Sequence, residues 1–71
     1  MKELTESQKR VYLSIKEYIN KNKISPSTRE LCELNGLTAP ATLNYHLKIL
    51  KEKGYITYRE KIPRSIVLIK N

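Results

Sequence analysis

The sequence has little cysteine and no long apolar run, and each shortage excludes a class of protein. A single cysteine, Cys32, cannot form a disulfide within the chain and fits a reducing compartment. The longest apolar run, residues 66–69, is too short to cross a bilayer, and the charged N-terminus is unlike a signal peptide. We therefore expect a cytoplasmic protein with no membrane partner.

The chain also lacks length, linkers and clustered reactive groups. Its 71 residues contain no repeat and no low-complexity tract, so we expect one domain over residues 1–71. Such a chain is too short to enclose a cleft, and no paired nucleophile and base is visible, so we do not expect an enzyme. His46 and Cys32 cannot supply a metal site, which needs about three or four ligands. We expect no metal or cofactor, and we interpret His46 as a packed or capping residue.

Basic residues outnumber acidic residues 14 to 7, and the excess is unevenly distributed. Residues 1–35 carry seven basic and five acidic side chains, whereas residues 36–71 carry seven and two. A one-sided excess indicates a polyanionic partner, which could be DNA, RNA or an anionic membrane. The plainer alternative is a soluble surface that is rich in lysine.

Two capping boxes predict where the first two helices begin. Residues 5–8 (TESQ) open a helix that should extend to about Asn20 or Lys21. Residues 27–30 (STRE) open a short second helix. Residues 35–36 (NG) should end it, because both residues tolerate the left-handed conformation of a helix C-terminus.

A third helix and a very short strand are also predicted. Thr38 or Ala39 should precede a helix that has Pro40 in its first turn and ends at Gly54. Between the first two helices, Ile24 is expected in a strand of one or two residues.

The C-terminal part of the chain has the pattern of an antiparallel hairpin. Residues 55–59 and 65–69 are rich in β-branched, aromatic and other apolar side chains, and the loop of residues 60–64 contains a proline. The order helix, short strand, helix, turn, helix, strand, strand is that of a winged helix-turn-helix. We therefore predict an α+β fold with three helices and a C-terminal antiparallel β-hairpin wing.

The predicted third helix has two different faces. Leu43, Leu47 and Leu50 recur at helical spacing and should face a core. The opposite side is small and polar, a combination that suits entry into the major groove of DNA. Its residues are Ala41, Asn44, Tyr45 and Lys48.

These outward side chains can be matched to base edges. The amide of Asn44 could pair with N6 and N7 of adenine, and Lys48 could reach a guanine or a phosphate. Tyr45 could bind a phosphate through its hydroxyl or place its ring against a thymine methyl group. Ala41 permits close approach, and Thr42 offers both a methyl group and a hydroxyl.

Two further segments carry groups that suit the phosphate backbone. Near the hairpin tip, cations could grip phosphate or the minor groove; these are Arg59, Lys61 and Arg64. At the start of the second helix, hydroxyls and a guanidinium could also reach phosphate; these are Ser27, Thr28 and Arg29. For Ser27 we expect helix capping to be the primary role.

Five segments together resemble the N-terminal DNA-binding domain of the LexA repressor family. The first helix, residues 4–19 (LTESQKRVYLSIKEYI), and the entry to the second, residues 25–31 (SPSTREL), are similar to that family. So are the turn at residues 36–40 (GLTAP), the third helix and its exit at residues 46–56 (HLKILKEKGYI), and residues 63–66 (PRSI). The resemblance covers nearly the whole chain.

The resemblance implies a bacterial or phage winged helix that reads the major groove through its third helix. The family's base-contacting positions fall on Ala39, Ala41, Thr42, Asn44 and Tyr45. Family members typically carry Ser and Asn, or a Ser-rich run, early in this helix, so their operator sequence is not implied here. The family's self-cleaving C-terminal domain, which also forms its dimer interface, has no counterpart in these 71 residues, so we expect no autoproteolysis.

We therefore predict sequence-specific binding of double-stranded DNA by a small, repressor-like transcriptional regulator associated with the nucleoid. A homodimer on a palindromic site would extend its short footprint. The alternative is a winged-helix adaptor that binds a partner protein without reading DNA. In that case Ile49 and the exposed tyrosines would be the anchors.

Overall fold

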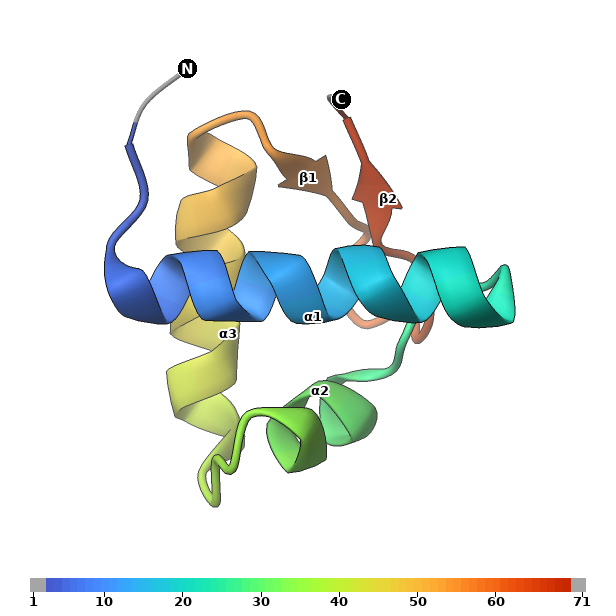
Figure 1. Cartoon of the computed structure of the whole chain (residues 1–71), viewed down its shortest axis with the longest axis horizontal. Coiled ribbons are helices and arrows are strands. Elements are labelled where there is room, and N and C mark those ends of the chain that lie inside the picture. Colours follow the sequence, from blue (N-terminus) through green and yellow to red (C-terminus); the bar gives the residue numbers. More distant parts are fainter. Residues whose placement is uncertain (1–2, 70–71) are drawn as a thin grey trace.

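The computed structural model describes residues 3–69, which form three helices followed by a two-stranded sheet. The elements are α1 (Glu6–Asn22), α2 (Thr28–Leu34), α3 (Pro40–Glu52), β1 (Ile56–Thr57) and β2 (Val67–Leu68). In Figure 1, α1 crosses the front of the molecule, α3 runs behind it in a different direction, and α2 lies below α1, beside the lower end of α3. The predicted three helices and C-terminal antiparallel hairpin are confirmed.

Both predicted capping boxes are present. The Thr5 hydroxyl accepts from the Gln8 N–H at 3.2 Å, and the Gln8 side chain accepts from the Thr5 N–H at 3.1 Å. The Ser27 hydroxyl accepts from the Glu30 N–H at 3.2 Å, and the Glu30 carboxylate accepts from the Ser27 N–H at 2.9 Å. Each box therefore satisfies backbone amides that have no partner within the helix itself.

The turn between α2 and α3 depends on a glycine. Gly36 has a φ of +67°, the left-handed region that other residues rarely adopt, and Leu37 N–H then donates back to the Cys32 carbonyl at 2.9 Å. Asn35 has a φ of −103°, so of the two predicted terminating residues only Gly36 is left-handed. Gly54 ends α3 in the same way, with a φ of +86°.

Two predictions between α1 and α2 are wrong. Helix α1 ends at Asn22, one or two residues later than expected, and Lys23 terminates it with a left-handed φ of 64°. Ile24 does not belong to any strand in the described part of the chain, and its side chain is 51% exposed. The neighbouring Ile66 N–H donates to the Ser25 hydroxyl at 3.1 Å rather than to a carbonyl, so no backbone ladder forms there.

The hairpin has the expected direction but much shorter strands than expected. Ile56 pairs with Leu68, and each strand contains two residues where the pattern predicted five. Beyond the strands, the Arg59 N–H donates to the Ser65 hydroxyl at 3.0 Å. A side chain therefore takes the place of the backbone ladder at the base of the loop.

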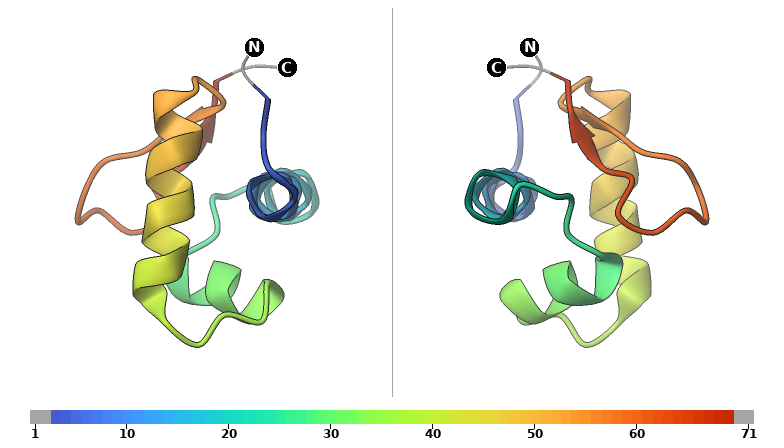
Figure 2. Two further views of the ribbon diagram at one scale, coloured as in Figure 1. Left: turned by 90° about the vertical axis from the view of Figure 1, so that its left-hand side faces the viewer. Right: turned by 90° about the vertical axis from the view of Figure 1, so that its right-hand side faces the viewer.

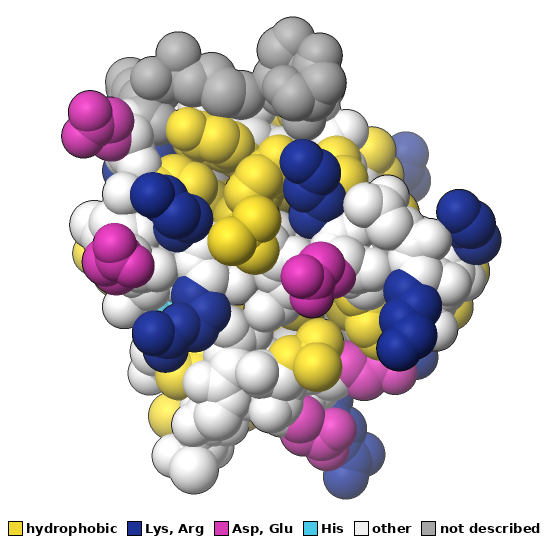
Figure 3. All heavy atoms as spheres, viewed as in Figure 1, with side chains coloured by type: hydrophobic (Ala, Val, Ile, Leu, Met, Phe, Trp, Pro, Cys, Tyr) yellow, Lys and Arg dark blue, Asp and Glu magenta, His cyan; other side chains and the backbone are white. Residues whose placement is uncertain are grey.

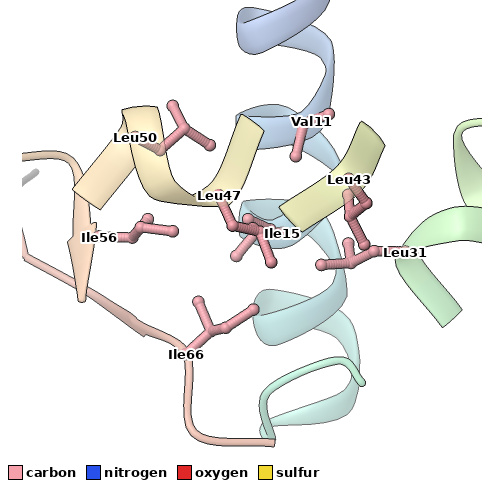
Figure 4. Packing of buried hydrophobic residues seen from close by; sticks show 8 residues of the cluster. All are labelled: Val11, Ile15, Leu31, Leu43, Leu47, Leu50, Ile56 and Ile66. Carbon is pink, nitrogen blue, oxygen red and sulfur yellow. The ribbon is translucent and has the colours of Figure 1, made fainter. Parts of the chain in front are cut away.

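The core lies where α3 meets α1, α2 and β1 (Figure 4). The three predicted leucines of α3 are all buried. Around them the other elements contribute Val11, Ile15, Leu31, Ile56 and Ile66. Burying an aliphatic side chain of this size stabilises the fold by about 1.5–3 kcal/mol. Because this packing fixes the inward side of α3, it also determines which residues of α3 face outward.

Candidate nucleic-acid interface

The side of α3 that faces away from the core is exposed along the helix. Tyr45 is 62% exposed, and Asn44 and Lys48 are also exposed. Ala39 precedes the helix as its N-cap residue without a side-chain capping bond, and it is exposed as well. Ala41 and Thr42 complete this outward set.

A groove separates α3 from the wing, which we define as residues 58–66 between the strands. Figure 2 shows the wing projecting beyond α3 on the side away from α1. The groove has a volume of about 590 Å³. It brings together predicted contact residues from α2, α3 and the wing, namely Thr28, Asn44, Lys48, Arg59, Lys61 and Arg64.

The remaining predicted contact residues lie outside the lining of this groove. Ala39, Ala41, Thr42 and Tyr45 are on the first turns of α3 or just before it. Arg29 is exposed on α2, and Ser27 is half-buried at its capping position. The capping role expected for Ser27 is therefore confirmed.

Four cations near the groove have no partner within residues 3–69. The side chains of Arg29, Lys48, Arg59 and Lys61 are exposed, and none of them forms a hydrogen bond or an ion pair with a described residue. Cations without internal partners are available to an anionic ligand.

Other basic residues in the second half of the chain hold the fold together. The Lys53 ammonium donates to the Glu3 carbonyl at 2.6 Å and to the Gln8 side chain at 3.1 Å. The Lys51 ammonium donates to the Tyr58 carbonyl at 3.2 Å and lies 4.7 Å from the centre of its ring. The basic side chains of residues 36–69 are thus divided between structural contacts and the groove.

Arg64 has several partners within the protein that the sequence analysis missed. Its guanidinium donates to the Glu30 carboxylate at 2.9 Å, to the Ser25 carbonyl at 3.0 Å and to the Tyr18 hydroxyl at 3.4 Å. We call these four residues the Arg64 clasp. The bond from Arg64, followed by that from the Ser27 N–H, lowers the pKa of Glu30 from 4.5 to about 2.

One signal of the clasp was visible in the sequence. Glu30 lies in residues 25–31 and Arg64 in residues 63–66, which are two of the family-like segments. The structure brings these two segments together. The sequence had suggested only DNA contacts for Arg64, to phosphate or the minor groove.

Among the groove-lining residues that were not predicted, two have ionisable side chains, Tyr58 and Glu60. Burial raises the pKa of the Tyr58 hydroxyl, and the nearby carboxylates of Glu60 and Glu52 raise it further. The hydroxyl therefore stays protonated and able to donate to an anion. Glu60 is the acidic residue in the lining, which is otherwise neutral or basic.

His46 packs on the flank of α3, as expected. Its side chain is half-buried, its ring centre lies 5.8 Å from that of Tyr45, and its Nδ1 atom is enclosed without a hydrogen-bond partner among the described atoms. No group of three or more His, Cys, Asp or Glu residues within residues 3–69 could hold a metal ion. The described helices are too short or too polar to cross a bilayer.

A glycine-dependent turn between two helices, an exposed face on the second of them and a cationic hairpin loop beside it define a winged helix-turn-helix. Residues 1–65 match the family model described as the LexA DNA binding domain. The chain belongs to this family of DNA-binding domains, and the resemblance seen in the sequence is confirmed.

The chain is similar to LexA repressors from several bacteria. It is 46% identical over 70 residues to that of Thermosipho melanesiensis, covering 99% of this chain and 35% of the relative. It is 38% identical over 66 residues to that of Carboxydothermus hydrogenoformans, covering 93% and 32%. It is 39% identical over 69 residues to that of Staphylococcus aureus, and the match covers 97% of this chain and 33% of the relative. The chain thus spans about a third of the length of these relatives.

Proposed function

We propose that this domain binds double-stranded DNA in a sequence-specific manner and acts as a small, repressor-like transcriptional regulator. The observation that carries the proposal is the groove between α3 and the wing. It joins an amide and an ammonium on α3, Asn44 and Lys48, to the unpaired cations Arg59 and Lys61. Such a regulator would act in the cytoplasm, on the nucleoid.

In this proposal α3 enters the major groove. A helix of about 10–12 Å diameter fits a groove that is about 12 Å wide. Asn44 would read adenine, Lys48 would reach guanine or phosphate, and Tyr45 would contact phosphate or a thymine methyl group. Small side chains at the start of the helix allow the close approach, namely Ala39, Ala41 and Thr42.

Groups beside α3 would hold the phosphate backbone. Arg59 and Lys61 supply charge from the wing, and Arg29 supplies it from α2. The hydroxyls of Ser27 and Thr28 lie at the start of α2. Contacts of this kind fix the orientation of a protein on the duplex, whereas base contacts carry the specificity.

Selection from a random-sequence duplex library at two salt concentrations tests the proposal. We expect a preferred sequence and a log–log salt slope of about −4, because four unpaired cations would each release about one counterion. Lys48→Gln should reduce the slope by about one. Lys16→Gln is a matched control, since Lys16 is exposed on α1. Failure to enrich any sequence at either salt concentration would reject specific DNA binding.

We further propose that two copies bind one palindromic site. A single winged helix covers a short sequence, and a second copy extends it with two-fold symmetry. A palindrome among the selected sequences, with two protomers per duplex in sedimentation, is the expected result. An asymmetric sequence with one protomer would contradict it.

One observation favours the alternative of a protein-binding adaptor. A second hollow of about 550 Å³ is lined by Leu4, Tyr12, Leu13 and Tyr55 together with the charged residues Glu3 and Lys9, and Figure 3 shows apolar side chains gathered above α1 on that face. Of the anchors predicted for this function, Ile49 is half-buried. Salt-insensitive binding of a partner protein, without duplex binding, would support the adaptor.

Of the tyrosines predicted as anchors, Tyr45 is exposed, and it lies on the face of α3 that we propose reads DNA.

A further inference from the structure

The returning half of the wing is fastened to the segment between α1 and α2. The Arg64 guanidinium spans Tyr18 at the end of α1, the Ser25 carbonyl and the Glu30 carboxylate on α2. Next to it, the Ile66 N–H donates to the Ser25 hydroxyl. Arg64 and Glu30 form the ion pair of the described chain, with side chains 41% and 32% exposed.

Apart from the clasp, the rest of the protein supports the wing mainly at its two ends, through the Lys51 bond to the Tyr58 carbonyl and the burial of Ile66. The two strands that flank the wing contain two residues each, and a short two-stranded hairpin is marginally stable by itself in water. Two of its residues, Lys61 and Arg64, have left-handed φ values of 66° and 55°, which non-glycine residues adopt at a cost. Contacts from outside the hairpin are therefore needed to hold this loop in one position.

We propose that Arg64 and Glu30 are positioning residues for DNA binding. In this view the Arg64 clasp holds the wing at the edge of the groove, so that Arg59 and Lys61 meet phosphates while α3 reads bases. The inference rests on the proposed function. If it is correct, Glu30 increases the affinity for DNA although its carboxylate carries the same sign of charge as the phosphates.

Glu30→Gln separates positioning from simple electrostatics. Glutamine also completes a capping box, so the bond from the Ser27 N–H is retained and α2 still begins correctly. Its amide nitrogen, however, faces the Arg64 guanidinium, and two donors cannot bond to each other. Electrostatics alone predicts tighter DNA binding after a negative charge is removed, whereas positioning predicts weaker binding.

Glu33→Gln is the matched control. Glu33 lies on the same helix, is exposed and has no ion-pair partner within residues 3–69, so the variant changes net charge equally but leaves the clasp intact. The probe is a labelled duplex carrying the selected sequence, titrated at several salt concentrations. We expect Glu30→Gln to weaken binding about tenfold and to reduce the salt slope by about two, because both wing cations lose their contacts. Glu33→Gln should bind as well as the parent or slightly better.

Arg64→Lys distinguishes the clasp from direct phosphate contact. Lysine keeps the charge but cannot reproduce the fork that reaches three acceptors. A direct contact would survive this change in large part, whereas the clasp would not. The double variant with Glu30→Gln should then bind about as weakly as either single variant, because both remove the same arrangement.

A measurement without DNA tests the clasp independently. Nitrogen-15 relaxation of the wing amides should show increased mobility in Glu30→Gln and Arg64→Lys, while the amides of α3 remain unchanged. If the mobility of the wing amides is unchanged in both variants, the inference is overturned. It is also overturned if the wing becomes mobile but the affinity for DNA is not reduced. If the parent binds no duplex at all, the proposed function fails together with the DNA-binding part of the inference, and the relaxation data still determine whether the clasp holds the wing.

Discussion

The two faces of α3 come from the same 13 residues but have opposite surroundings. On the inward face Leu43 and Leu50 are 0% exposed and Leu47 is 4% exposed, whereas Tyr45 on the outward face is 62% exposed. The inward side chains find all their contacts within the chain. The outward side chains of Asn44, Tyr45 and Lys48 make few contacts within the chain. Their polar groups are therefore the ones that could bond to a nucleic acid. The comparison separates residues that stabilise the fold from those available for recognition.

The largest expected effect comes from the inward face. Leu47→Ala should lower the free energy of unfolding by about 2–5 kcal/mol, because it removes buried apolar contacts and leaves a cavity. In a domain this small, that is most of the available stability. Urea denaturation measures the loss. Lys48→Ala, one residue along on the outward face, should change stability by less than about 0.5 kcal/mol; similar losses in both variants would contradict the division between the faces.

The next effect belongs to the outward face and rests on the proposed function. Asn44→Ala should reduce discrimination between the selected duplex and a scrambled one by about 1–3 kcal/mol, the contribution of one bidentate base contact. Thermal stability should remain unchanged, because Asn44 is exposed. Competition binding with both duplexes is the measurement, and Asn20→Ala on α1 is the control. Undiminished discrimination would exclude Asn44 from base reading.

A smaller effect is expected at the turn that sets α3 against α2. Gly36→Ala should cost about 1–2 kcal/mol of stability, because an L-residue is strained in the left-handed region. An added Cβ would meet no atom within 4 Å, so the cost should come from the backbone alone. Gly36→Asn should cost less, since Asn tolerates this conformation better. Equal losses for Ala and Asn in chemical denaturation would argue against a conformational origin.

The smallest effect concerns acid stability. Arg64 and the Ser27 N–H lower the pKa of Glu30 from 4.5 to about 2, so the folded state favours the carboxylate. This contribution to stability is fully present above pH 4.5 and is lost as the pH falls toward 2. Solvent screening keeps it small for an exposed pair. Glu30→Gln should therefore flatten the decline in unfolding free energy over this range, and an unchanged pH profile would show that the pair contributes nothing.

Local features of this molecule could be predicted because neighbouring residues determine them. The capping boxes at Thr5 and Ser27 involve residues three positions apart, and the leucine stripe of α3 depends only on the period of the helix. Gly36 likewise ends α2 through bonds within its own turn.

Two of the errors occurred where a side-chain hydroxyl accepts a backbone N–H that a predicted strand would have used. Ile24 lacks a strand because the Ser25 hydroxyl accepts the Ile66 N–H. The strands are short because the Ser65 hydroxyl accepts the Arg59 N–H. Strand propensity alone contains no information about these side-chain partners.

The sequence by itself determined the order of the elements, the two faces of α3 and the family to which the domain belongs, because these depend on residue spacing of a few positions and on recognisable segments. Only the tertiary structure decided which cations are available to a ligand. The Lys53 ammonium is bonded to the Glu3 carbonyl, 50 positions away, and the Arg64 guanidinium to the Glu30 carboxylate, 34 positions away. The Lys48 side chain, by contrast, has no partner among the described residues. Contacts over such separations exist only once the core has brought α1, α2 and the hairpin around α3.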